Sequence, residues 1–135
     1  MWKEENMKLL IGIFLLALAM PAFPQNAPKP SVPRYNPAAE AVYKGTVVDV
    51  RDRQCPVSGG MGSHIILQLG NGTIEVHLAT TEFTKMAELN LRKGDQVEVT
   101  GWKTEFGGVQ TIFAREVRHG QDVFTFREKD GTPAW

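Results

Sequence analysis

Apolar and polar residues alternate along most of the second half of the chain, a two-residue period that is typical of half-buried β-strands. The clearest run spans residues 95–104, where the alternation is strict up to Gly101. Gly94-Asp95 favours a turn before this run, and a glycine inside a strand often marks a bend or bulge. The pattern predicts a strand that buries one face and therefore needs other strands to cover it.

A β-hairpin is predicted around Asn71-Gly72, because Asn-Gly is the strongest short hairpin signal. Alternating apolar residues flank this turn on both sides. With Asn71 and Gly72 as the turn residues, six apolar side chains share one face, in the pairs Leu69–Ile74, Leu67–Val76 and Ile65–Leu78. This agreement predicts the register, because a shift by one residue would bury the polar side chains instead.

Further strands are expected at residues 42–51, 109–118 and 122–127, which are rich in β-branched and aromatic residues. Residues 52–63 contain Pro56 and three glycines, so a loop is expected there.

A helix is expected at residues 80–91, where apolar residues recur at helical spacing and a threonine can cap the first turn. Phe83 and Met86 are its candidates for closing one end of a barrel. Short antiparallel strands with one helix between the third and fourth are the plan of an OB-fold, a five-stranded Greek-key barrel. We therefore expect an all-β OB-fold domain over residues 40–135, with a short extra C-terminal strand. An SH3-like barrel is the alternative.

The N-terminal residues follow a different pattern. Lys8 precedes an apolar run at residues 9–20, and small residues and prolines follow it. This order is typical of a secretory signal peptide, expected here at residues 1–22. The run is shorter than the roughly 20 residues that a membrane-spanning helix needs, so no stable membrane span is expected after cleavage. An uncleaved anchor is the alternative.

Two details of this region stay open. Cleavage is expected after Ala22 or, as the second choice, after Gln25, and the chain can start at Met1 or Met7. Residues 23–39 contain five prolines and are expected to form an extended linker. Together these features predict a periplasmic or secreted bacterial protein.

Charge and cysteine content exclude some classes of protein. Lys and Arg number 15, Asp and Glu also number 15, and the net charge is zero. Domains that bind nucleic acid usually carry a basic stripe, so this balance disfavours nucleic acid as the partner. Cys55 is the single cysteine, which rules out a disulfide within the chain.

The expected hairpin register also gathers side chains on its outer face, where OB-folds bind ligands. His77 would lie opposite Ile66, with His64 as its diagonal neighbour at roughly 7–8 Å. We expect this face to bind an unknown small ligand or a protein partner. The predicted ligand-binding residues are His64, Ile66, Gln68, Glu75 and His77.

Two imidazoles at this separation can share a metal ion, since neutral imidazole is the commonest metal donor. Cys55 or Met61, in the expected loop, can add a soft donor for copper or zinc. His64, His77 and Cys55 are therefore the predicted metal ligands. The alternatives are a histidine-lined ligand surface without metal and ordinary surface histidines, because a closed zinc site needs four ligands and no CxxC or HxxxH pattern occurs.

No catalytic motif is recognisable. The sequence contains no Ser-His-Asp pattern and no recognisable pair of catalytic carboxylates, and the glycine-rich stretch at residues 59–62 lacks the lysine and helix of a phosphate-binding loop. Cys55 has no evident base beside it. We therefore expect a protein that is not an enzyme.

Several short motifs occur in a characteristic order. They are Gly45-Thr46-Val47, residues 60–64, residues 72–78, residues 93–101, Ala114-Arg115-Glu116 and residues 130–135. In this order they resemble a group of small exported bacterial OB-fold proteins, over residues 43–135. The resemblance implies the fold and export, and it implies no activity.

The plan is also distantly similar to the periplasmic OB-fold stress proteins and to the OB-fold haem chaperone of cytochrome c maturation. The chain lacks the permanent membrane anchor and the C-terminal histidine motif of that chaperone, which disfavours haem transfer.

The first hypothesis is thus an exported, non-enzymatic OB-fold binding module whose ligand face is the outer side of the second and third strands. The alternatives are a periplasmic copper- or zinc-binding protein and a module that binds nucleic acid or oligosaccharide on the same face. The balanced charge disfavours nucleic acid here as well.

Overall fold

The computed structural model describes residues 32–135, so the expected signal peptide, its cleavage sites and both start methionines lie outside the described part of the chain. Six strands, one α-helix and a short 3-10 helix are present there. In chain order they are η2 (Pro37–Ala39), β1 (Glu40–Cys55), β2 (Gly60–Leu69), β3 (Gly72–Thr80), α1 (Thr81–Met86), β4 (Gln96–Phe106), β5 (Val109–His119) and β6 (Asp122–Thr125). Among residues 32–135, no helix has both the length and the apolar character to cross a membrane.

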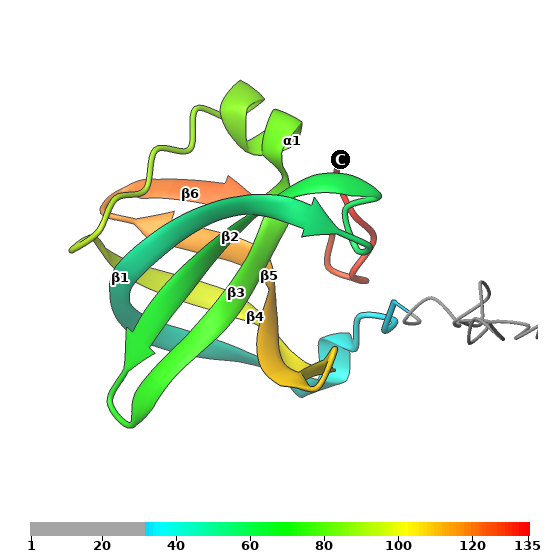
Figure 1. Cartoon of the computed structure of the whole chain (residues 1–135), viewed down its shortest axis with the longest axis horizontal. Helices are drawn as coiled ribbons and strands as arrows, with labels where there is room; N and C mark the ends of the chain where they lie inside the picture. The colour runs from blue at the N-terminus through cyan, green and yellow to red at the C-terminus, as the bar shows by residue number, and fades with distance from the viewer. Residues whose placement is uncertain (1–31) are drawn as a thin grey trace, which may run out of the picture.

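The strands form one strongly curved sheet that closes on itself (Figure 1). The first part of β1 pairs with β4 and its second part with β2, both antiparallel. β3 pairs with β2 on one side and, in parallel over three residues, with β5 on the other. The resulting ring order β1-β2-β3-β5-β4, with a helix between β3 and β4, is the plan of an OB-fold. The predicted fold class is confirmed, including the extra strand β6 beside β5.

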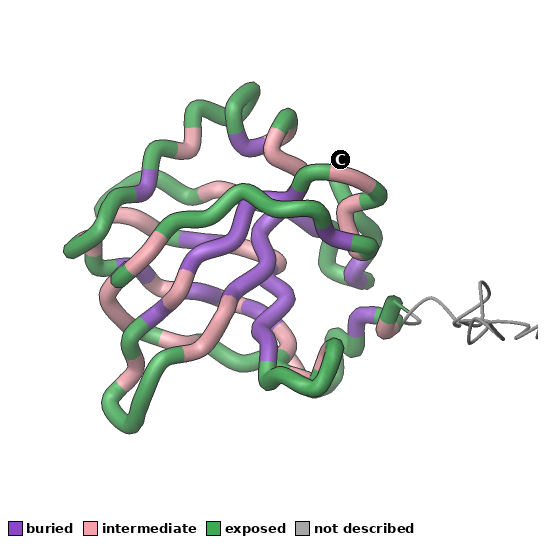
Figure 2. The backbone as a smooth tube through the Cα atoms, in the orientation of Figure 1, coloured by how far each residue is buried: buried purple, intermediate pink, exposed green. Residues whose placement is uncertain are grey.

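The core fills the interior of this ring. Figure 2 shows buried stretches along the central parts of β2 and β3. Two bulges, which bend strands, accompany the closure: Val48 is the extra residue in β1, and Arg115 is the extra residue in β5, opposite Thr100 and Gly101. A side chain at Gly101 would collide with the backbone carbonyl of Phe113. The predicted bend at this glycine is therefore present, and close packing of two backbones is its cause.

The register of the β2–β3 hairpin differs from the expected one by two residues. Leu67 pairs with Ile74 and Ile65 with Val76, because the turn residues are Gly70 and Asn71. A shift of two residues keeps every side chain on its original face. The predicted inward set is thus right, while the predicted partners are wrong.

Two expected elements differ in length. Residues 52–63 were expected as a loop, yet β1 continues to Cys55 and β2 starts at Gly60, because the two strands keep pairing beyond the first half of β1. The helix is only six residues long. Met86 at its end is 76% exposed, so its predicted role in closing the barrel is wrong, whereas Phe83 packs against the core.

Candidate metal centre

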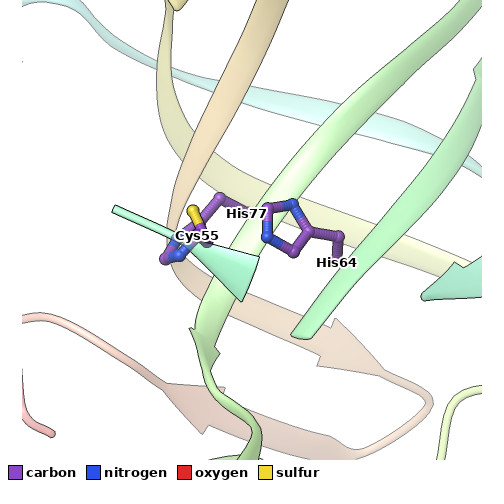
Figure 3. A group of neighbouring side chains, drawn as sticks. All are labelled: Cys55, His64 and His77. Atoms are coloured by element: carbon purple, nitrogen blue, oxygen red, sulfur yellow. The ribbon is translucent and has the colours of Figure 1, made fainter. Parts of the chain in front are cut away.

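Three side chains that can bind metal converge from three neighbouring strands. Cys55 ends β1, His64 lies on β2 and His77 lies on β3 (Figure 3). One potential ligand atom from each residue lies within 4.8 Å of the other two. Their exposed fractions are 6%, 2% and 1%, in the same order. Within residues 32–135 this is the one such group of three or more donors.

The register of the β2–β3 hairpin brings the two histidines face to face. His64 pairs directly with His77 in the same register as Ile65 with Val76, and the bulge of this strand pair lies just beyond them, between Ser63 and His64. Their ring centroids lie 4.9 Å apart with the planes nearly perpendicular, at 87°. The prediction that His77 lies opposite Ile66 is therefore wrong, because Ile66 pairs with Glu75.

The outer face of the hairpin is covered at this end. The ring centroids of Phe113 and Trp135 each lie 5.8 Å from that of His77, and Ser58, on the turn after β1, contacts the same ring. His64 and His77 are consequently buried, which excludes the alternative of ordinary surface histidines. Gln68 stays exposed at the other end of the hairpin, where its amide donates to the carbonyl of Leu69.

His64 has one ring nitrogen beside a carboxylate. Its Nδ1 lies 3.0 Å from Oε1 of Glu75, and Glu75 also forms an ion pair with Arg53. Neither ring nitrogen has a well-aligned hydrogen bond within the described part of the chain. An Nδ1–H directed at Glu75 leaves the lone pair of Nε2 free, which is the usual arrangement of a metal-binding histidine. Burial lowers the pKa of His64, so the ring is neutral at pH 7.

His77 is held neutral more strongly. Burial, reinforced by the nearby His64 and Arg127, lowers the pKa of His77 to about 3. Its Nε2 lies 2.9 Å from Oγ of Ser58, which sits on the turn after β1. Its Nδ1 has no hydrogen-bond partner among the described residues. Both imidazoles are therefore in the form that binds metal.

Space for the cluster depends on Gly62. A Cβ atom there would lie 2.5 Å from Oγ of Ser58 and 3.2 Å from both Nε2 of His64 and Cβ of Cys55. Neighbouring residues of a strand point to opposite faces. Met61, which is 44% exposed, therefore points away from the cluster and does not supply the soft donor that its position suggested.

The three donors line one side of a cavity of about 280 Å³. The β4–β5 hairpin contributes Phe106, Val109 and Phe113 to its lining, together with Gly107 and Thr111. A metal bound to the three donors would border this space.

Comparison with known proteins places the chain in a family. Residues 40–124, which include all three donors, match the MamS/MamX magnetosome protein family. This chain belongs to that family. The comparison with curated proteins gave no match.

Three solved structures are similar to part of this family member. One is a replication protein A heterotrimer bound to ssDNA, with 17% identity and a TM-score of 0.47. The match covers 59% of that chain and 62% of this one. Another is the second OB-fold domain of replication protein A from Methanococcus maripaludis (18%, 0.45), covering 87% of that chain and 63% of this one. A third is the ZRD-deleted mutant of TiaS in complex with agmatine (19%, 0.45), covering 25% of that chain and 64% of this one.

Sequence reasoning named the three donors but missed the residues that support them. Ser58 and Gly62 lie in the segment expected as a loop, and Arg53, which pairs with Glu75, was not among the predicted site residues. Glu75 was expected on a ligand surface, and it instead contacts His64. Its position two residues before His77 on one strand was the available signal, because such residues share a face.

Proposed function

We propose that this protein is an exported, non-enzymatic OB-fold module that binds one soft or borderline transition-metal ion, Cu(I) or Zn(II), through Cys55, His64 and His77. The observation that carries the proposal is the convergence of three buried donor atoms within 4.8 Å of one another. Export is supported by the N-terminal sequence pattern. Thiolate and imidazole together suit copper and zinc better than hard cations.

The energetics of burial favour a bound ion. A buried polar atom without a hydrogen bond costs about 1–3 kcal/mol, and both histidines carry such nitrogen atoms here. A metal ion would satisfy one nitrogen of each ring and the thiolate at once. In a tetrahedral zinc site, bond lengths of about 2.0–2.3 Å place ligand atoms roughly 3.3–3.8 Å apart, so only a small contraction of the cluster is required.

The same residues fit a catalytic thiol less well. A cysteine nucleophile needs a hydrogen bond to its base. The thiol of Cys55 is free, and among residues 32–135 its sulfur makes no side-chain hydrogen bond, although Glu75 and His64 stand in the order of a triad. The spacing therefore favours an ion between the donors over direct proton transfer.

The test is a competition titration of the purified protein against chromophoric chelators of Cu(I) and Zn(II). We expect one equivalent bound with submicromolar affinity, and a loss of at least about 100-fold in Cys55→Ser and His77→Ala. His119→Ala is the matched control, because His119 lies on β5 outside the cluster. Affinity that is unchanged in the cluster variants, or no binding by the unaltered protein, would refute the proposal.

A further inference from the structure

We infer that the centre holds Cu(I) on three protein ligands, with one coordination position open to the neighbouring cavity, and that this position takes a small thioether, free or as an exposed methionine side chain of a partner. The inference rests on the proposed function. It adds the oxidation state of the metal and the chemical class of the external ligand.

The described residues supply no fourth ligand. Ser58 is engaged with His77, and Glu75 contacts both His64 and Arg53. Met61 points to the opposite face. Because the three donors come from adjacent strands on one wall of the cavity, a metal between them keeps its remaining side toward that space.

Charge favours the monovalent ion. Arg127 is 6% exposed, and the described part of the chain offers it no carboxylate within ion-pair distance. Its guanidinium stacks 4.8 Å from the ring of Trp135, which in turn contacts His77. One thiolate neutralises Cu(I) completely but leaves Zn(II) or Cu(II) with one positive charge. A buried charge beside an unpaired cation is costly, so the neutral Cu(I) complex is preferred.

The far wall of the cavity selects the external ligand. Phe106 and Phe113 pack edge to face with centroids 5.8 Å apart, and Val109 adjoins them. Sulfur of a thioether contacts aromatic rings favourably, and its methyl and methylene groups suit an apolar wall. The side chains of Phe106, Val109 and Phe113 offer no hydrogen-bond acceptor to the N–H group of an imidazole and no donor to an anion.

Carbon monoxide is the probe for the open position, because it binds three-coordinate Cu(I) and reports through its infrared stretch. We expect a single C–O band from the anaerobic Cu(I)-loaded protein. Dimethyl sulfide should remove the band at a lower concentration than imidazole or azide. Val109→Ser should require roughly four- to tenfold more dimethyl sulfide, since it removes about one apolar group from the wall.

The matched control is Val123→Ser, which changes a similarly exposed valine on β6 and should leave the competition unchanged. Bound Cu(I) without a C–O band, or displacement preferentially by imidazole or azide, would overturn this inference and leave the metal site standing. Binding of Zn(II) but not Cu(I) would also overturn this inference while leaving the proposed metal site standing. If neither ion binds, the proposed function itself fails.

Discussion

At the scale of a single residue, Gly62 leaves the space that the neighbouring groups of the metal centre occupy. It follows Met61 on β2, and the space where its side chain would lie is shared by Ser58, Cys55 and His64. Any side chain here has to push apart groups from two strands. The absence of a side chain here thus lets Cys55, Ser58 and His64 lie close together.

Gly62→Ala should weaken metal affinity by about 10- to 100-fold, the usual range for a change next to the ligands. The methyl group would meet Oγ of Ser58 and Nε2 of His64. Gly60→Ala is the control, because nothing lies within 4 Å of a Cβ atom at Gly60. Chelator competition measures both variants, and equal affinities would contradict this role for Gly62.

Because of His77, the free energy of unfolding of the metal-free protein should be smaller in mild acid than at neutral pH. Its pKa is about 3 in the folded state against 6.5 for an ordinary histidine, so only the unfolded chain takes up the proton between these values. The stabilisation is complete above pH 6.5 and is lost as the pH falls toward 3. The slope is about 1.4 kcal/mol per pH unit for one histidine, and the lowered pKa of His64 acts in the same direction.

Urea unfolding with a chelator present, between pH 4 and 7.5, measures this slope. His77→Gln should reduce it, because glutamine does not titrate. A free energy of unfolding that is constant or rises as the pH falls would contradict the burial of a neutral imidazole at this position.

Residue identities alone located the donors but not their environment. Two histidines and a cysteine near one hairpin were visible in the sequence, and alternation placed His64, Glu75 and His77 on one face. Their burial depends on Phe113 and Trp135, which are distant in sequence. The pattern of one hairpin carries no information about which distant segments cover it.

At the scale of elements, the β2–β3 hairpin and α1 show what a local pattern determines. Alternation predicted the inward faces of both strands correctly. The bulge beside Ser63 was not predicted; its extra, unpaired residue is Leu78 on β3. The direct pairing of His64 with His77 follows from the register set at the turn and does not depend on this bulge.

The short helix α1 depends on its cap. The hydroxyl of Thr80 accepts a hydrogen bond from the backbone N–H of Phe83, at 3.1 Å. Thr80→Ala should lower the free energy of unfolding by about 1 kcal/mol, as measured by urea denaturation. Thr125→Ala, an exposed threonine at the end of β6, should change it little. Equal effects of the two changes would argue that α1 forms without this cap.

At the scale of the whole molecule, the two ends of the described chain meet beside the metal centre. The guanidinium of Arg127 lies over the rings of Tyr35 and Trp135, at 5.2 and 4.8 Å. Tyr35 also donates to Glu40, which accepts from Arg115. A buried residue from the expected linker thus belongs to the packing that surrounds His77.

Gly131→Ala should disturb this packing. Gly131 has φ +93°, and a Cβ atom there would lie 2.6 Å from the ring of Tyr35. Gly120 also has positive φ, at +62°, but nothing lies near its Cβ position, so Gly120→Ala isolates the backbone strain. We expect Gly131→Ala to lower the free energy of unfolding by about 1–3 kcal/mol more than Gly120→Ala. Equal losses would contradict the close contact with Tyr35.

The OB-fold itself followed from the order of strands and one helix, because that order leaves few ways to close a small sheet. Contacts between the ends, such as Tyr35 with Arg127, could not be predicted, since neither residue belongs to a periodic segment. The metal centre could be predicted in part: the local sequence pattern identifies its donors, but long-range packing, which the pattern does not reveal, buries them.

X-ray absorption at the copper edge of the Cu(I)-loaded protein tests the central claim most directly. The account predicts a first shell with one sulfur and two imidazole nitrogens in the unaltered protein, and loss of the sulfur in Cys55→Ser. A shell of light atoms only, or an identical spectrum from Cys55→Ser, would contradict the assignment of Cys55, His64 and His77 as the metal ligands.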